Sequence, residues 1–387
     1  METTSAACNA FADIRAFNRT RRKRARELKK QGKLIVGYLC CYVPVEILTA
    51  LDIVPYRIQG NVTKPVVEAD AYLDITTCPY IRSCFDLALN GEYDFLDGLV
   101  MPHSCYNVRR VYDIWRYYCN SGFFHLINVP HMMDRSSYQF FKREIETFVK
   151  SLEKFTGRKL KLDRLQQSIN LHNENRSLLR QLYGLRKESP PLISGVEMTR
   201  TLIAGMGLPV TEYSNLVKQL IVEVEKRRDH PANKGARILL YGHEIDDTAF
   251  VELVEECGAH VVIDDICTGS RYFWQDVKPS NDLLESLATR YLNGIPCPRT
   301  YKPRAETRDK DLENRFGYLS NFVEEFDVNG AIFYVMRYCD TLQLDVPDAR
   351  DYLQKKGIPV LVLEDDYRLT SLARFRTQIQ AFLEILG

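Results

Sequence analysis

Two blocks of this 387-residue chain alternate short apolar runs with segments whose apolar residues recur at helical spacing. Such alternation predicts strands that pair in parallel, with the helices between them covering the sheet. The first block predicts four strands, at KLIVGYL (33–39), VPYRI (54–58), FLDGLVMP (95–102) and FFHLINVP (123–130). The helices predicted between them lie at 44–52, 79–90 and 105–118.

The second block repeats this organisation after a stretch of a different character. Its predicted strands are 236–242, 259–265, 330–339 and 358–366, and its predicted helices are 247–258, 280–294, 346–357 and 370–386. The intervening stretch predicts long helices at 138–155, 162–187, 195–206 and 212–228, followed by a linker at 229–235 (DHPANKG). No short-period repeat is visible.

We therefore expect an α/β protein with two doubly wound, Rossmann- or flavodoxin-like parallel sheets. The predicted division is a basic N-terminal helix at 1–33, a first α/β domain at 34–135, a helical connecting segment at 136–234 and a second α/β domain at 235–387. A chain of this length, 45% hydrophobic, is able to bury a sizeable core.

Charge and hydropathy exclude several classes of partner. The formal net charge is +1, which gives no overall attraction to nucleic acid, and the basic run at 19–30 is typical of a solvated helix face or an arm against a partner subunit. The most apolar stretch, 34–54, is interrupted by Pro44, Glu46 and Asp52 and is not expected to span a membrane. The first 30 residues show no secretory signal, so we expect a cytoplasmic protein.

Three of the eleven cysteines occupy unusual places. Cys105 and Cys339 follow predicted strands, and Cys78 precedes a predicted helix. Ligands of open α/β sheets bind beyond the carboxyl ends of the strands, and a helix N-terminus stabilises thiolate sulfur. These cysteines are far apart in sequence, so only a folded cleft between the two domains could bring them together. Their positions alone leave two interpretations open, a shared metal site and buried structural cysteines.

Other candidates are weaker. Glu46 and His103 are candidate acid–base residues, although Glu46 also suits the first turn of a helix. Thr268, Ser270 and Arg271 lie in a predicted loop, where they would either contact an anionic substrate group or form a polar turn. No GxxxxGK[S/T] motif is present, so the chain is not expected to bind ATP through a P-loop.

Several longer segments together resemble one protein family. They are GYLCCYVPVEILTALDIVPYRIQG, CPYIRSCFDLALNGEYDFLDGLVMPHSCYNVRRVYDIW, IDDICTGSRYF and RYCDTLQLDVPDARDYLQKKGIPVLVLEDD. In order and separation they resemble the 2-hydroxyacyl-CoA dehydratase and benzoyl-CoA reductase family, from about residue 34 onward. The resemblance implies an oxygen-sensitive 4Fe-4S cluster held in the interdomain cleft by the matching residues Cys78, Cys105 and Cys339.

The resemblance also implies partners and a reaction. Members of the family receive single electrons from a separate ATP-hydrolysing iron–sulfur activator, and they pair with a homologous larger subunit or a second copy of themselves. The chain is most similar to the smaller cluster-bearing subunit of ATP-dependent benzoyl-CoA reductase, which implies electron transfer to an aromatic acyl-CoA thioester. The alternatives are a ketyl-radical 2-hydroxyacyl-CoA dehydratase and an electron-relay subunit that binds no substrate.

A third branch of the family carries a fused 8Fe-9S double-cubane cluster and reduces small molecules. Such a cluster needs about six thiolates, and this chain has enough cysteines to supply them. The additional candidates are Cys40, Cys41, Cys119 and Cys297, with Cys267 a weaker one. The sequence leaves the single and the double cubane open.

Overall fold

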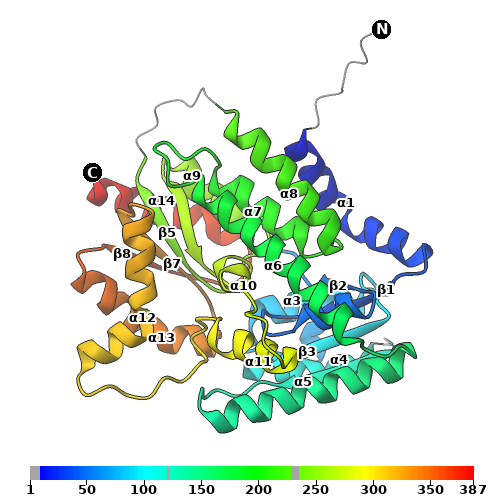
Figure 1. Ribbon diagram of the computed structural model, residues 1–387. Helices are drawn as coiled ribbons and strands as arrows, with labels where there is room; N and C mark the ends of the chain where they lie inside the picture. The colour runs from blue at the N-terminus through cyan, green and yellow to red at the C-terminus, as the bar shows by residue number, and fades with distance from the viewer. Residues whose placement is uncertain (1–8, 120–121, 228–234) are drawn as a thin grey trace.

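The computed structural model of the protein describes residues 9–119, 122–227 and 235–387, and its strands form two four-stranded parallel sheets (Figure 1). The first sheet has the order β2-β1-β3-β4 and the second the equivalent order β6-β5-β7-β8. The strands are β1 Leu34–Tyr38, β2 Ile53–Arg57, β3 Gly98–His103, β4 Phe123–Asn128, β5 Arg237–Gly242, β6 His260–Asp265, β7 Gly330–Met336 and β8 Val360–Asp365. All eight predicted strands and the α/β fold class are confirmed.

The central strands are apolar because helices cover both faces of each sheet. Every residue of β5 and of β7 is buried, as expected for strands of a covered parallel sheet. The two strands pair in parallel from Ile238 with Gly330 to Gly242 with Tyr334. Gly242 sits close to the backbone of β7, since a Cβ atom there would lie 2.4 Å from the carbonyl oxygen of Tyr334.

Fourteen α-helices are found in the described part of the chain. They are α1 Ala10–Lys30, α2 Val45–Ala50, α3 Pro79–Leu89, α4 Tyr106–Tyr118, α5 Arg135–Thr156, α6 Leu162–Gly184, α7 Gly195–Gly205, α8 Val210–Glu225, α9 Ala249–Glu256, α10 Ser270–Phe273, α11 Leu283–Asn293, α12 Arg308–Glu325, α13 Asp340–Lys355 and α14 Leu372–Leu386. Two short 3-10 helices lie at Ala69–Ala71 and Leu369–Ser371.

Three helices differ from expectation, and the first is α10, whose residues Ser270 and Arg271 are predicted to lie in a loop. No helix is predicted where α12 lies, although Leu312, Phe316 and Leu319 are buried at three- and four-residue spacing. The many charged residues of its first turns hide this pattern. The helix expected from 346 begins six positions earlier, at Asp340, and contains Pro347 within it. The first turns of α13 therefore follow directly from the end of β7.

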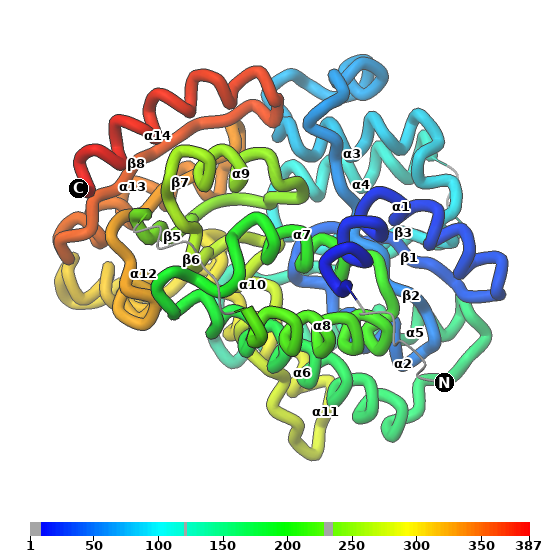
Figure 2. Tube along the Cα trace, turned by 90° about the horizontal axis from the view of Figure 1, so that it is seen from above, coloured from blue at the N-terminus to red at the C-terminus, as the bar shows by residue number. Residues whose placement is uncertain are grey.

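The helices between the two sheets are shared by both halves of the molecule (Figure 2). Helix α5 contacts β4 and α11, whereas α7 contacts β6 and α9. Helix α6 contacts α2 of the first half and α10 of the second. The described helices include none that is long and apolar enough to cross a membrane. Residues 229–234 of the predicted linker lie outside the described residues.

Candidate functional site

The carboxyl ends of the two sheets enclose a cavity of about 100 Å³ whose wall is rich in sulfur. Six cysteines line it, and each half of the chain contributes three of them. They are Cys40, Cys78 and Cys105 from the first half and Cys267, Cys297 and Cys339 from the second. The fold thus brings together the three residues predicted as cluster ligands, Cys78, Cys105 and Cys339, which we call the first trio. The other three, Cys40, Cys267 and Cys297, are the second trio and line the same wall.

Three long helices begin at this cavity with a cysteine. Cys78, Cys105 and Cys339 are the N-cap residues of α3, α4 and α13. The backbone N–H groups of Val108 and Leu342 lie in the first turns of α4 and α13, near enough to lower the pKa of the Cys105 and Cys339 thiols. Because free N–H groups and a partial positive charge mark each helix start, this wall is suited to negatively charged sulfur.

These three thiols hold their protons in the absence of a cation. Burial raises the pKa of Cys78 to about 12, and the proximity of Cys339 contributes to this rise. Burial likewise raises the pKa of Cys105 and of Cys339, and the backbone N–H groups offset part of this effect. A metal group that binds here must therefore displace protons from the thiols.

The second trio has different surroundings. Cys40 lies just after β1 with a positive φ of 61°, a conformation that non-glycine residues rarely adopt. The thiol of Cys41 lies between Cys40 and Cys267, and the single hydrogen bond that it donates lowers the pKa of Cys40 to about 6 or that of Cys267 to about 7. The Arg271 guanidinium also donates to the Cys267 sulfur, at 3.7 Å. Neighbouring donors thus favour thiolate at Cys40 or Cys267, whereas burial raises the pKa of Cys297 to about 12, as it does for Cys78.

Asn107 ties the three ligand-bearing segments of the first trio together. Its side-chain oxygen accepts a hydrogen bond from the backbone N–H of Cys78, at 3.1 Å. Its amide nitrogen donates to the carbonyl oxygen of Tyr338, also at 3.1 Å. Asn107 itself follows Cys105 by two positions, and Tyr338 precedes Cys339. One buried amide therefore spans the two halves of the molecule at the thiol wall.

A buried charge pair stands beside the sulfur atoms. Arg57 donates to Glu244, which lines the cavity together with His243. Burial raises the pKa of Glu244 to about 7, although Arg57 partly offsets it, and burial lowers the pKa of His243 to about 4. Among the described residues, Oε1 of Glu244, Nε2 of His243, and Nε and Nη1 of Arg57 have no hydrogen-bond partner. Buried polar atoms without a hydrogen-bond partner are unusual in the core of a native protein.

Six candidate residues do not line the cavity, and they are Cys41, Cys119, His103, Thr268, Ser270 and Glu46. Cys41 is buried behind it and reaches it only through its hydrogen bonds to Cys40 and Cys267. Cys119 caps the far end of α4, roughly 20 Å from Cys105 by the helical rise. His103 ends β3, and burial lowers its pKa. The structure does not bring Cys119 or His103 to the thiols.

The loop candidates have partners within the protein. Thr268 donates to the carbonyl oxygen of Ile245, and Ser270 donates to that of Asp264. Arg271 makes two hydrogen bonds of 2.9 Å to Asp265 while lining the cavity. These contacts favour a structural role for Thr268 and Ser270, whereas Arg271 both ties α10 to the end of β6 and faces sulfur.

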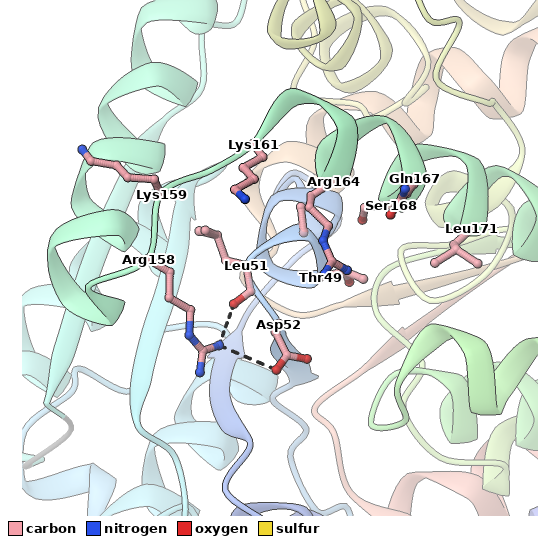
Figure 3. Close-up of a pocket in the computed structure, with 11 residues that line it drawn as sticks. Thr49, Leu51, Asp52, Arg158, Lys159, Lys161, Arg164, Gln167, Ser168 and Leu171 are labelled. Atoms are coloured by element: carbon pink, nitrogen blue, oxygen red, sulfur yellow. Dashed lines mark hydrogen bonds and ion pairs between the residues drawn. The ribbon is translucent and has the colours of Figure 1, made fainter.

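A second hollow, of about 500 Å³, lies between the end of α2 and the start of α6 (Figure 3). Its described lining residues include no cysteine and none of the residues that line the thiol cavity. The hollow is therefore a separate feature of the surface.

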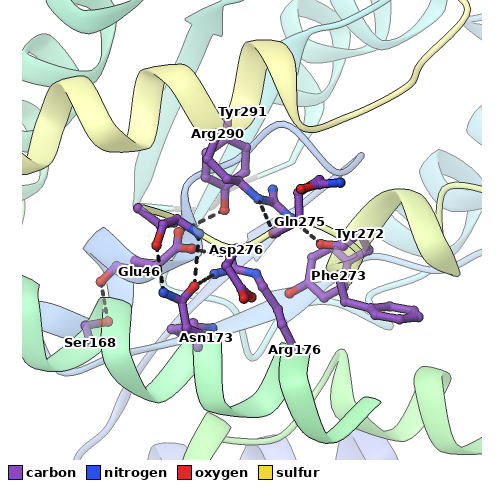
Figure 4. A network of polar contacts seen from close by, with 12 residues as sticks. Glu46, Ser168, Asn173, Arg176, Tyr272, Phe273, Gln275, Asp276, Arg290 and Tyr291 are labelled. Carbon is purple, nitrogen blue, oxygen red and sulfur yellow. Dashed lines mark hydrogen bonds and ion pairs between the residues drawn. The ribbon is translucent and has the colours of Figure 1, made fainter. Parts of the chain in front are cut away.

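Glu46 lies in a buried polar network, away from the thiol cavity (Figure 4). Its two carboxylate oxygens accept hydrogen bonds from Arg176 and from Tyr291, the latter at 2.8 Å. Since both oxygens are occupied and the side chain is fully buried, the geometry favours a structural role over acid–base chemistry.

The donors of the thiol cavity are of the kind that iron–sulfur clusters use. The described residues contain no group of three or more His, Cys, Asp or Glu side chains placed to hold one metal ion. The donors are nevertheless thiols from several segments, together with unpartnered polar atoms of Glu244 and His243. Thiolate ligands select soft metals and iron–sulfur clusters, and a cluster spreads its ligands more widely than an ion does. The residues present therefore fit an iron–sulfur cluster.

Several cavity residues escape prediction from the sequence. His243 and Glu244 directly follow β5, so the strand-end rule applied to Cys105 would also have selected them. Arg299 lines the cavity and donates to the carbonyl oxygens of Ser104 and Val129, each at 2.7 Å. Nothing in the local pattern around Asn107 or Arg299 marks either residue, because their partners are distant in sequence.

Comparisons with known proteins agree on one family. A family model described as 2-hydroxyglutaryl-CoA dehydratase, D-component, matches residues 40–386. The chain is 24% identical over 379 residues to the (R)-phenyllactyl-CoA dehydratase beta subunit of Clostridium sporogenes, covering 98% of each chain. It is 26% identical over 340 residues to a benzoyl-CoA reductase subunit of Thauera aromatica, covering 85% of each. It is 24% identical over 363 residues to the beta subunit of (R)-2-hydroxyglutaryl-CoA dehydratase of Acidaminococcus fermentans, covering 92% of this chain and 94% of that one.

Proposed function

The chain belongs to the 2-hydroxyglutaryl-CoA dehydratase D-component family, and from this we propose that it is the iron–sulfur catalytic subunit of an activator-driven reductase. The family resemblance seen in the sequence is thereby confirmed. The observation that carries the proposal is a cavity lined by six cysteines from both halves of the chain. A family of dehydratase and reductase subunits supports a catalytic role.

The first trio and the residues around it each have a part in this proposal. Cys78, Cys105 and Cys339 hold a 4Fe-4S cluster, and the N-termini of α3, α4 and α13 stabilise its negative charge. Asn107 keeps their three segments in register across the two halves. Such a cluster supplies single electrons at low potential when bound. Glu244 and His243 present polar atoms beside it, where a substrate oxygen or a proton would need them.

The proposed partners rest on the missing P-loop motif and on the names of the related proteins. The sequence has no P-loop, so a separate ATP-hydrolysing iron–sulfur activator would deliver the electrons. The relatives are named as subunits, which supports assembly with a homologous larger subunit or a second copy of this chain. The relative named as a benzoyl-CoA reductase subunit supports an aromatic acyl-CoA thioester as the electron acceptor.

Iron and acid-labile sulfide, counted per chain after anaerobic purification, test the cluster directly. About four irons per chain are expected if only the first trio binds, and about eight if both trios do. A chain purified and reconstituted without oxygen that holds no iron would overturn the proposal.

A small-molecule reductase with an 8Fe-9S double cubane is the second candidate function. The second trio favours it, because Cys40, Cys267 and Cys297 line the same cavity as the first. Replacing Cys267 by Ala should then reduce the iron count from about eight toward about four. An unchanged count of about four in both proteins would exclude the double cubane.

Electron stoichiometry separates a reductase from a dehydratase. A reductase consumes reductant for every product molecule, whereas a ketyl-radical dehydratase recovers its electron and needs only a catalytic amount. Reductant consumed with the activator and ATP present, divided by product formed, gives the answer. Acyl-CoA binding to the isolated chain, compared with binding to the assembled complex, tests the electron-relay alternative, in which only the partner binds substrate.

A further inference from the structure

The hollow of about 500 Å³ beside α2 and α6 is strongly basic. It is formed by the last turn of α2, the connection that follows α5, and the first turns of α6 (Figure 3). Its lining residues are Thr49, Ala50, Leu51, Asp52, Arg158, Lys159, Lys161, Arg164, Gln167, Ser168 and Leu171. Four of these are cationic and one is anionic.

The carboxylate of Asp52 offsets only part of the positive charge of the hollow. Asp52 pairs with Lys33 at 2.7 Å, outside the lining, and with one nitrogen of Arg158 at 3.7 Å. Lys159 pairs with Glu153 at 2.9 Å and is 84% exposed, and Figure 3 shows it directed away from the hollow.

Two cations of the hollow remain without a counter-charge. Lys161 and Arg164 have neither an ion pair nor a side-chain hydrogen bond within the described part of the chain. Figure 3 shows both side chains extending from the start of α6 toward the end of α2. Two unpaired cations that converge on one hollow form an electrostatic site for an anion.

The backbone adds further donors at the same place. Helix α6 is 23 residues long, and its N-cap residue, Lys161, offers no side-chain acceptor to the first-turn N–H groups. One nitrogen of the Arg158 guanidinium donates to the carbonyl oxygen of Leu51 at 2.9 Å. This contact orients the guanidinium at the rim and leaves its other N–H groups for a ligand.

We propose that this hollow binds a phosphorylated small molecule that carries adjacent phosphoryl groups, as nucleoside diphosphates do. Lys161, Arg164 and Arg158 would contact the phosphoryl oxygens. The volume is within the range of small-molecule sites and exceeds the need of a single phosphate ion. Thr49, Gln167 and Leu171 offer mixed polar and apolar surface to an organic group.

This site is distinct from the thiol cavity and adds to the proposed function. No described residue lines both, and α2 separates Cys40 from the Thr49–Asp52 side of the hollow. A ligand bound here does not touch the sulfur atoms. Binding of a ligand to the hollow can therefore be measured on the full chain whether or not the chain holds iron.

Isothermal titration of the full-length protein with pyrophosphate, ADP, coenzyme A and inorganic phosphate tests the site. The titrations are made at constant ionic strength, with sulfate as the reference anion, because exposed charges are screened by salt. The double variant Lys161→Gln, Arg164→Gln removes the two unpaired cations. A double variant Lys150→Gln, Lys154→Gln removes two exposed charges from α5, outside the lining, as the matched control.

The expected result is that the unmodified protein binds pyrophosphate more tightly than sulfate. The affinity for pyrophosphate should be at least about tenfold lower in the Lys161, Arg164 variant than in the unmodified protein. The control variant should bind as the unmodified protein does. Tighter binding of ADP than of coenzyme A, or the reverse, would identify the organic group. Binding of pyrophosphate no tighter than that of sulfate, or equal in the unmodified protein and the Lys161, Arg164 variant, would overturn the proposal. Both side chains are exposed, so neither replacement is expected to impair folding.

Discussion

Two buried polar regions lie between the halves of this molecule, and they differ in how their carboxylates are paired. In the network around Glu46, both carboxylate oxygens have partners and Arg176 donates also to Asn173, so that Nη1 of Arg290 is the atom left without a partner among the described residues of the network. In the thiol cavity, Glu244 and His243 each keep an atom without a partner among the described residues. Both regions are assembled from residues distant in sequence.

The difference indicates which region is structural and which is a binding site. A buried carboxylate with both oxygens paired holds segments together, and removing it leaves a cation without compensation. In a cavity lined by six thiols and by unpartnered polar atoms, these atoms are available to a bound cofactor or ligand. Variants of the two regions should therefore fail in different ways, the first in stability and the second in metal content.

The largest effect is expected from Cys105→Ala. It removes a sulfur from the α4 N-cap and should lower the iron content to near zero while the fold is retained. Iron and sulfide counts with circular dichroism measure both properties. Cys84→Ala is the matched control, since Cys84 is fully buried but does not line the cavity. Full iron content in the Cys105 variant would contradict the ligand assignment.

Glu46→Ala should affect stability rather than iron. It leaves the buried Arg176 guanidinium without its carboxylate, which costs about 3–5 kcal/mol. Chemical denaturation measures the loss, and iron per folded chain should be unchanged. Glu174→Ala removes one partner of the exposed pair with Lys218 and should cost at most about 1 kcal/mol. Equal losses in the two variants would refute a structural role for the Glu46 network.

The same network predicts that stability falls with decreasing pH, through Glu46 and through the buried His172, whose ring acts on the Glu46 carboxylate and hydrogen-bonds the Thr49 hydroxyl at 2.9 Å. Burial lowers the pKa of His172 to about 4 from an ordinary 6.5, so below pH 6.5 the unfolded chain takes up a proton that the folded one refuses. Burial alone would raise the pKa of Glu46, but Arg176 and then His172 outweigh it and lower it to about 2 from 4.5. Both groups therefore stabilise the fold at neutral pH and lose this contribution toward pH 2.

Urea unfolding between pH 7 and pH 3 measures this dependence. The free energy of unfolding should decrease first through the His172 range and then through the Glu46 range. The variants Glu46→Gln and His172→Gln should each flatten their own part of the profile. A profile that is the same in both variants and in the unmodified protein would show that other groups are responsible.

The smallest effect is expected from Asn107→Asp. The replacement keeps the acceptor for the Cys78 N–H but removes the donor to the Tyr338 carbonyl, a loss of about 1–2 kcal/mol. The rate at which a chelator removes iron should then rise by roughly tenfold, with iron content at first near normal. Asn90→Asp loses a donor outside the cavity and serves as the control. Equal chelation rates in both variants would argue against positioning by Asn107.

Local pattern was enough to predict the sheets. Alternation of apolar and helical segments is a property of consecutive residues, and it located all eight strands and both blocks. It failed where charge masked the apolar spacing, as in α12, and where a helix continued through a proline, as in α13. The strand-end rule likewise pointed to Cys105 and Cys339 from their neighbours alone.

The composition of the thiol wall was decided by tertiary structure. The sequence by itself determined two parallel sheets, cysteines at their carboxyl ends and the resemblance to one family. It could not determine that Cys267 and Cys297 would face the same cavity as Cys105, or that Cys119 would not. It also could not separate Glu46, a member of a paired network, from Glu244, which borders the sulfur atoms. Secondary structure follows from neighbours along the chain, whereas a cavity wall depends on how segments hundreds of residues apart pack together.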